Sequence, residues 1–303
     1  MITEREQYYM FLEEIFNKYF SIKEQIVYHY TSPEALKEII KSKTLWLSDI
    51  HYMNDKSEIE YTKTLLIKIL ANKENLNEDF LNVIINCLNI GENASKDIYI
   101  PRAFKRQHYV TSFSLSSDEL SLWNYYTKND QKGGYNIGFN IKKMLNKFEL
   151  LKYGKIIDGK IIYKESEQQR IINLLLDKFN ERYNESEDSL SQDMLIEGFM
   201  SFINILSLFF KSEVFAAEKE YRIIFTDYTS RNHSTKSQNY KREYRILNGT
   251  FIPYVQQDFS SNDIESITAS PLIDFSLSSG LNSFLRDNDI KIEVTKSKIP
   301  LRY

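Results

Sequence analysis

The chain has 303 residues and a formal net charge of −3, from 39 Lys plus Arg against 42 Asp plus Glu, so polyanion binding cannot rest on net charge. Only nine residues are glycine, and neither G-x-G-x-x-G nor G-x-x-x-x-G-K-[ST] occurs, which argues against the common glycine-built phosphate loops. The single cysteine, Cys87, excludes an intrachain disulfide and a thiolate metal cage. The N-terminal residues do not resemble a secretion signal, so we expect a cytoplasmic protein.

Hydrophobic periodicity divides the chain into helical and extended segments. Turn residues set several boundaries: Ser32-Pro33 is a typical helix start, Asp55 with Glu58 fits a capping box, and Asp158-Gly159 predicts a hairpin turn. The elements predicted in chain order are a helix at 3–20, a strand at 26–31, a helix from 33, a strand at 44–48, helices to about 71 and from 77 to 90, a strand at 109–114, a short helix from 117, a strand at 135–139, a hairpin within 149–163, helices at 165–185 and 189–212, strands at 221–225, 243–256, 263–269 and 291–297, and a helix at 275–287.

These elements predict the domain organisation. Because there is no internal repeat and no low-complexity linker, we expect a single α+β domain over 1–303. Residues 1–25 hold its N-terminal helix, and 55–105 and 165–212 are helical insertions. The longest apolar stretch, 202–210, is shorter than the roughly 20 residues that cross a bilayer, so no membrane association is expected.

Two predicted strands carry polar side chains that suit a ligand. On the strand at 26–31, alternation places His29 and Thr31 on one face, where they can hydrogen-bond ribose hydroxyls; the alternative is a satisfied histidine beside a turn threonine. Around the strand at 221–225, Glu218, Glu220 and Arg222 lie opposite the apolar face. Such a wall can stabilise a sugar cation, and its alternative is a solvated strand face with ordinary ion pairs.

A third segment combines hydroxyl groups with flat rings. Ser112 and Ser114 flank a phenylalanine, and Trp123 and Tyr126 follow shortly before Gly133-Gly134. A planar base or a nicotinamide can stack on such rings. Trp123 and Tyr126 also have helical spacing, so a place in the core is an equal alternative.

Two other groups favour structural roles. Asp49, His51, Asp55 and Glu58 match no zinc or calcium spacing, so the capping box is preferred and no metal is expected. The segment 231–245 is rich in Lys and Arg around His233, which predicts an exposed loop, with nucleic-acid contact as the less favoured alternative.

Taken together, these segments resemble a known family. Their order is similar to that in the bacterial domain-of-unknown-function (DUF) family 2971, which itself resembles the ADP-ribosyltransferases. The resemblance implies NAD bound in a cleft between two small antiparallel sheets. The pieces that carry it are Tyr28-His29-Tyr30-Thr31, Asn54-Asp55 with Glu58, Thr111-Ser112-Phe113-Ser114, Trp123 with Tyr126, Gly134 to Gly138-Phe139, Glu218-x-Glu220-Tyr221-Arg222 and Ser297-Lys298-Ile299-Pro300.

The resemblance also implies a reaction and residue roles. NAD would be cleaved at its nicotinamide–ribose bond, and ADP-ribose would pass to a protein or nucleic-acid acceptor or to water, in a phage-defence or toxin role. The implied catalytic residues are Glu220, Glu218 and Tyr126. The implied NAD-binding residues are His29, Thr31, Ser112, Ser114, Trp123 and Arg222.

Two other functions stay open from the sequence. One is a non-catalytic module on the same fold that senses a nucleotide or a nucleic acid. The other is an interaction scaffold in which the apolar faces of the helices at 3–20 and 165–212 form a homodimer.

Overall fold

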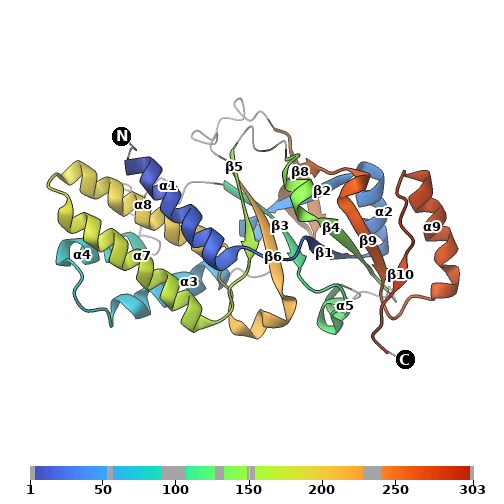
Figure 1. Cartoon of the computed structure of the whole chain (residues 1–303), viewed down its shortest axis with the longest axis horizontal. Coiled ribbons are helices and arrows are strands. Elements are labelled where there is room, and N and C mark those ends of the chain that lie inside the picture. The colour runs from blue at the N-terminus through green and yellow to red at the C-terminus, as the bar shows by residue number, and fades with distance from the viewer. Residues whose placement is uncertain are drawn as a thin grey trace. The chain divides into compact units, whose positions relative to one another are not determined.

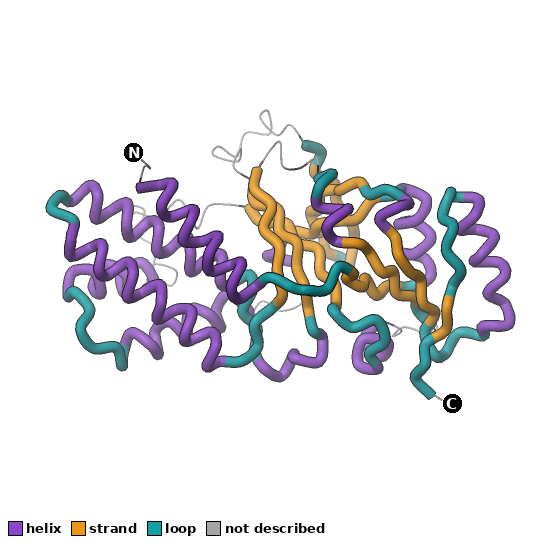
Figure 2. The backbone as a smooth tube through the Cα atoms, in the orientation of Figure 1, coloured by secondary structure: helices purple, strands orange, loops and turns teal. Residues whose placement is uncertain are grey.

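The computed structural model of the protein describes residues 4–52, 57–89, 107–126, 133–148, 150, 154–227 and 240–300 (Figure 1). The chain forms two compact units, each assembled from three separate segments. The helical unit comprises Met1–Ser21, Met53–Gln107 and Ile161–Phe215, and the sheet unit comprises Ile22–Tyr52, His108–Lys160 and Ala216–Tyr303. Figure 2 distinguishes the helices of the first from the strands of the second by colour.

The helical unit overlaps the N-terminal helix and the two helical insertions that periodicity predicts. Its helices bury aromatic rings that pack edge to face: Phe179 contacts Phe199 and Phe202, each at a centroid distance of 5.6 Å. The helix predicted at 189–212 ends at Ser207. The described elements are α1 (Glu4–Ile15), η1 (Phe16–Phe20), α3 (Ser57–Leu70), α4 (Glu78–Asn89), α7 (Glu165–Glu185) and α8 (Ser189–Ser207).

A buried glutamine ties three parts of the helical unit together. The Gln168 side-chain amide donates to the carbonyls of Ile162 and Lys211, at 2.7 and 3.0 Å. Its oxygen accepts from the Tyr61 hydroxyl at 2.7 Å. Gln168 is fully buried, so these bonds satisfy polar groups that water cannot reach.

The sheet unit has helices packed on a mixed sheet. The prediction of the α+β class is confirmed. Its elements are β1 (Ile26–Thr31), α2 (Pro33–Ser42), β2 (Thr44–Asp49), η2 (Ile50–Tyr52), β3 (Gln107–Ser114), α5 (Leu120–Tyr126), β4 (Tyr135–Asn140), α6 (Ile141–Leu145), β5 (Gly154–Lys160), η5 (Glu213–Glu218), β6 (Glu220–Asp227), β7 (Arg242–Leu247), β8 (Thr250–Asp258), η6 (Ser261–Asp263), β9 (Ile264–Ala269), η7 (Phe275–Leu277), α9 (Ser278–Asp287) and β10 (Thr295–Lys296).

The described strands form one ten-stranded sheet rather than two separate ones. Its main path is β10-β9-β4-β1-β3-β2-β8-β7, and β6 pairs with β3 and β5. β10 runs parallel to β9, whereas β1 is antiparallel to both neighbours. β1 pairs with β4 over its whole length but with β3 only at Tyr28 and Ser114. The sheet is therefore weakly joined between β1 and β3, and the finer likeness to an ADP-ribosyltransferase stays a prediction.

One face of this sheet supports the core of the unit. Val27 of β1, Phe113 of β3 and Tyr221 of β6 are buried in the same apolar cluster. Helices α2, α6 and α9 contribute Leu36, Ile40, Ile141, Met144 and Leu285 to it. The alternation of the strands places this cluster on one face and leaves the opposite face for other side chains.

One predicted turn and two predicted strands differ from the structure. Asp158-Gly159 lies inside strand β5, where the Asp158 carboxylate accepts a hydrogen bond from the Tyr221 hydroxyl. The predicted strand at 243–256 is a hairpin instead, because Asn248 and Gly249 adopt φ values of 49° and 75° and turn the chain. The predicted strand at 291–297 is reduced to the two residues of β10.

Replacing Gln168 by Leu should lower the free energy of unfolding by about 2 to 3 kcal/mol, because two buried carbonyls and a hydroxyl lose their partner. Tyr61→Phe is the matched control, and it should cost only about 1 kcal/mol since it removes one bond. Urea denaturation followed by circular dichroism measures both values. Equal losses in the free energy of unfolding for the two variants would show that Gln168 does not hold these segments together.

Candidate functional site

A buried ion pair lies at the start of β6. Glu220 and Arg222 are two residues apart on the strand, so their side chains share a face. Arg222 Nε donates to Glu220 Oε1 at 2.6 Å and Nη2 donates to Oε2 at 3.0 Å. The two residues are only 6% and 2% exposed. Glu220 and Arg222 thus share one face, as alternation predicts, and the alternative of a solvated strand face is wrong because every residue of β6 is buried.

The pair shares its face of the sheet with two serines of β3. His108 Nδ1 lies 2.9 Å from Thr226 Oγ1, which places these residues of β3 and β6 on one face. By alternation, Ser112 and Ser114 belong to the same face as His108. The Ser114 hydroxyl donates to the Glu218 carbonyl at 2.8 Å, whereas the buried Ser112 hydroxyl has no hydrogen-bond partner among the described residues.

Glu218 does not continue the alternation of β6. It is the last residue of η5, and Lys219 after it has a left-handed φ of 45°. This conformation is costly for a lysine and breaks the extended geometry between the two glutamates. The Lys219 carbonyl accepts from the amide of Leu115 at 2.8 Å, and its amine pairs with Glu119 at 3.1 Å. Only Glu220 of the two carboxylates is therefore aligned with Arg222.

His29 and Thr31 lie on the opposite face of the sheet. Tyr28 pairs with Ser114, so the neighbouring His29 points to the side of Phe113, and the two rings are 5.7 Å apart. His29 Nδ1 donates to the Ser112 carbonyl at 3.2 Å. The structure thus brings His29 next to the backbone of Ser112 and not to the carboxylate of Glu220. Burial lowers the pKa of His29, and this effect exceeds the smaller opposing effect of the carbonyl.

Trp123 is a core residue of the sheet unit. It is 1% exposed, and its ring meets that of Tyr30 edge to face at 4.7 Å. The indole N–H donates to Asp118 at 2.7 Å. The two predicted roles are a platform for a ligand ring and a place in the core, and this geometry agrees with a place in the core. The side chain of Tyr126, the last residue of α5, lies outside the described residues.

The loop after β3 is held in place by Asp118 and Asn136, which the sequence does not mark as functional residues. Asp118 accepts hydrogen bonds from Trp123, from the Ser297 hydroxyl at 2.7 Å and from the Lys298 amide at 2.7 Å. Asn136 of β4 donates to the Ser117 carbonyl. Asp118 was assigned to the start of a helix, and α5 begins only at Leu120. No local pattern signals a partner almost 180 residues away.

A hollow of about 470 Å³ lies elsewhere in the sheet unit. It is bordered by the start of α2, the start of β4 and the N-terminal end of α9. Apolar side chains dominate it, with Glu34, Tyr135, Asp274 and Ser278 as polar members. None of the predicted site residues lines this hollow.

The remaining predicted groups lie only partly within the described residues. Within the described part of the chain, no cluster of three or more His, Cys, Asp or Glu side chains could hold an ion. His51 Nδ1 lies 2.9 Å from Asp49, whereas Asp55 and the Glu58 side chain lie outside the described residues. Most of the basic segment 231–245, including His233, lies outside them as well. None of the described helices is long and apolar enough to cross a bilayer.

Comparison with known proteins gives one match. Residues 122–223 match the family described as "Protein of unknown function (DUF2971)". The matched region covers less than half of the chain, from α5 through α7 and α8 to Ile223 of β6, and it supports the resemblance to this family. No curated protein and no solved structure matches the chain.

His29 should make the stability of the fold depend on pH. Its folded pKa lies below the ordinary value of 6.5, so the stability it contributes is present above pH 6.5 and is lost as the pH falls toward the folded pKa. Between pH 7.5 and 5.5, the free energy of unfolding should therefore fall less for His29→Gln than for the wild type. Urea denaturation at both values measures the difference.

His51 provides the control of opposite sign. Its hydrogen bond to Asp49 raises its pKa, so it contributes stability that is present at low pH and is lost as the pH rises. His51→Gln should consequently steepen the fall between pH 7.5 and 5.5. Equal falls in the wild type and in His29→Gln would contradict the lowered pKa of His29.

Proposed function

We propose that the protein is an ADP-ribosyltransferase-like enzyme that cleaves the nicotinamide–ribose bond of NAD. The observation that carries the proposal is the buried bidentate pair of Glu220 and Arg222, on the same face of the sheet as the Ser112 hydroxyl, which has no partner within the described part of the chain. A buried ion pair contributes little to stability, whereas a carboxylate held rigidly beside a donor suits a developing positive charge. The resemblance to DUF family 2971 points to the same residues.

In the proposed reaction, the negative charge of the Glu220 carboxylate stabilises the transition state. The bond between nicotinamide and ribose breaks with its electron pair on nicotinamide, which leaves as a neutral molecule. Glu220 accepts a hydrogen bond from the ribose 2′-hydroxyl and offsets the positive charge of the oxocarbenium-like ribose. A water or an acceptor group then bonds to the anomeric carbon and loses one proton to solvent.

Four other residues have supporting roles in this proposal. Arg222 orients Glu220, because its Nε and Nη2 both donate to that carboxylate. Ser112 offers its hydroxyl to the ligand from the same face of the sheet. His29 acts as a positioning residue, because it holds the Ser112 carbonyl from the opposite face. Tyr126 stays the proposed partner of the nicotinamide ring.

The test is incubation of the purified full chain with NAD, with protein and RNA acceptors supplied, followed by chromatography of nicotinamide. Glu220→Gln should lower the rate at least about 100-fold, the usual effect of removing one electrostatic contact in a transition state. Glu218→Gln is the matched control and should keep most of the rate, because Glu218 is not aligned with Arg222.

Stability and activity must be separated in this experiment. Removing one partner of a buried pair costs about 3 to 5 kcal/mol, so the thermal midpoint of each variant is measured as well. The double variant Glu220→Gln with Arg222→Gln leaves no unpaired charge and should fold yet stay inactive. A wild type that releases no nicotinamide and modifies no acceptor, or a Glu220→Gln variant with unchanged rate, would refute the enzyme.

The same geometry favours one second candidate, a module that binds a nucleotide without turnover. Both carboxylate oxygens of Glu220 accept from Arg222, so the acid is held by protein rather than offered to a substrate. Calorimetry with NAD, cyclic nucleotides and short RNA distinguishes the two, because this candidate predicts saturable binding of a ligand that is recovered intact. A phage-defence role and a homodimer belong to either candidate as further proposals.

A further inference from the structure

The first helix of the helical unit ends in a π-helical turn. The amide of Ser21 donates to the carbonyl of Phe16, five residues back, at 3.1 Å. π-helical turns are rare in proteins and occur frequently at functional sites. This turn carries Lys18 and Tyr19, which no other part of our proposals uses.

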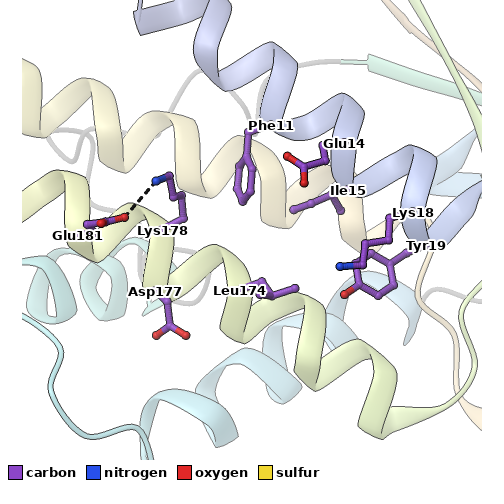
Figure 3. Close-up of a pocket in the computed structure, with 9 residues that line it drawn as sticks. All are labelled: Phe11, Glu14, Ile15, Lys18, Tyr19, Leu174, Asp177, Lys178 and Glu181. Carbon is purple, nitrogen blue, oxygen red and sulfur yellow. Dashed lines mark hydrogen bonds and ion pairs between the residues drawn. The ribbon is translucent and has the colours of Figure 1, made fainter.

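Lys18 and Tyr19 border a hollow between α1 and α7 (Figure 3). Its volume is about 530 Å³, within the range of small-molecule sites, and sites between the helices of a bundle are common. Phe11, Ile15 and Leu174 form its apolar middle, with Leu174 still 40% exposed. The remaining lining residues, all charged apart from Tyr19, are Glu14, Lys18, Tyr19, Asp177, Lys178 and Glu181.

The charged groups are paired at one end of the hollow but not at the other. Lys178 pairs with Glu181 at 3.0 Å, and Asp177 pairs with Lys73 at 2.5 Å. Lys18 has no carboxylate partner among the described residues. In Figure 3 its amine lies beside Tyr19, at the end away from Lys178 and Glu181. A ligand anion would therefore be attracted to the Lys18 end.

Tyr19 adds a hydrogen-bonding group to this end. The residue is only 6% exposed, and its buried hydroxyl has no partner among the described residues. A buried hydroxyl without a partner costs free energy, which a ligand oxygen would recover. The Lys18 amine lies 5.3 Å from the centre of the Tyr19 ring. Because lysine is long and flexible, its amine can turn toward a ligand that reaches the Tyr19 hydroxyl.

We propose that this hollow binds a small amphiphilic carboxylate. The apolar body would cover Phe11, Ile15 and Leu174, and the carboxylate would accept from the Lys18 amine and the Tyr19 hydroxyl. Glu14, one turn before Lys18, disfavours an anion nearer the middle and so sets the position of the head group. Charged side chains line both ends of the hollow, which suits a short molecule better than the helix of a protein partner.

Titration calorimetry of the full chain with decanoate tests the proposal. Saturable binding of one decanoate per chain is expected, at least tenfold tighter than decanol, which has the same apolar body without the charge. Decyltrimethylammonium, which reverses the charge, should not bind. Lys18→Met should weaken decanoate binding at least tenfold, and Tyr19→Phe by about threefold to tenfold.

Two further variants keep the test specific. Lys178→Met removes the cation at the opposite end and should change the affinity less than threefold. Leu174→Trp fills the hollow from a partly exposed position and should abolish binding while the chain stays folded. The proposal is overturned if decanoate does not bind saturably, if the cationic analogue binds equally well, or if Lys18→Met or Leu174→Trp binds like the wild type.

Discussion

A guanidinium buried in the middle of a sheet must be neutralised where it lies, and the Arg222–Glu220 pair meets this requirement. Two bonds from the guanidinium fix both carboxylate oxygens, so the first residues of β6 have little freedom. The neighbouring Lys219 adopts a left-handed backbone conformation just before the strand begins. Its carbonyl accepts a hydrogen bond from the amide of Leu115. The position of the loop after β3 is thus a consequence of how one charge is buried.

That loop then joins the two halves of the sheet, which share only one residue pair between β1 and β3. The Tyr30 hydroxyl of β1 donates to the Ser116 carbonyl at 2.9 Å and accepts from the Glu119 amide at 3.1 Å. The Asp118 carboxylate accepts further hydrogen bonds from the Trp123 indole and from the Ser297 hydroxyl. Several residues that carry the resemblance to DUF family 2971 are therefore fastening groups, and the chemistry of the proposed site falls on the Glu220–Arg222 pair.

Much of the fold could be predicted because it follows from local patterns. Periodicity located most helices and strands, and alternation placed Glu220 with Arg222. The Asn248-Gly249 turn also has a local signal, but the apolar run on both sides of it predicts one continuous strand. Asp158-Gly159 has the composition of a turn and lies in a strand, because Asp158 finds a distant partner in Tyr221.

The candidate sites were harder to predict because they depend on tertiary pairing. The left-handed φ of Lys219 has no signature in a lysine, and it separates Glu218 from Glu220. His29 was placed on the correct strand, but the sequence does not reveal that its face is the apolar one. Periodicity likewise marks Tyr19 as buried without showing that its hydroxyl lacks a partner among the described residues.

The segments of the two units alternate along the chain, and this order affects how the protein folds during translation. The helical unit needs the segment that ends at Phe215 before its first helix can find all its neighbours. The hydrogen bond between Asp118 and Ser297 forms later still, because Ser297 follows Asp118 by 179 residues. Translation therefore exposes β1 and β3 to solvent well before their final contacts exist, a situation in which slow folding and chaperone capture are expected.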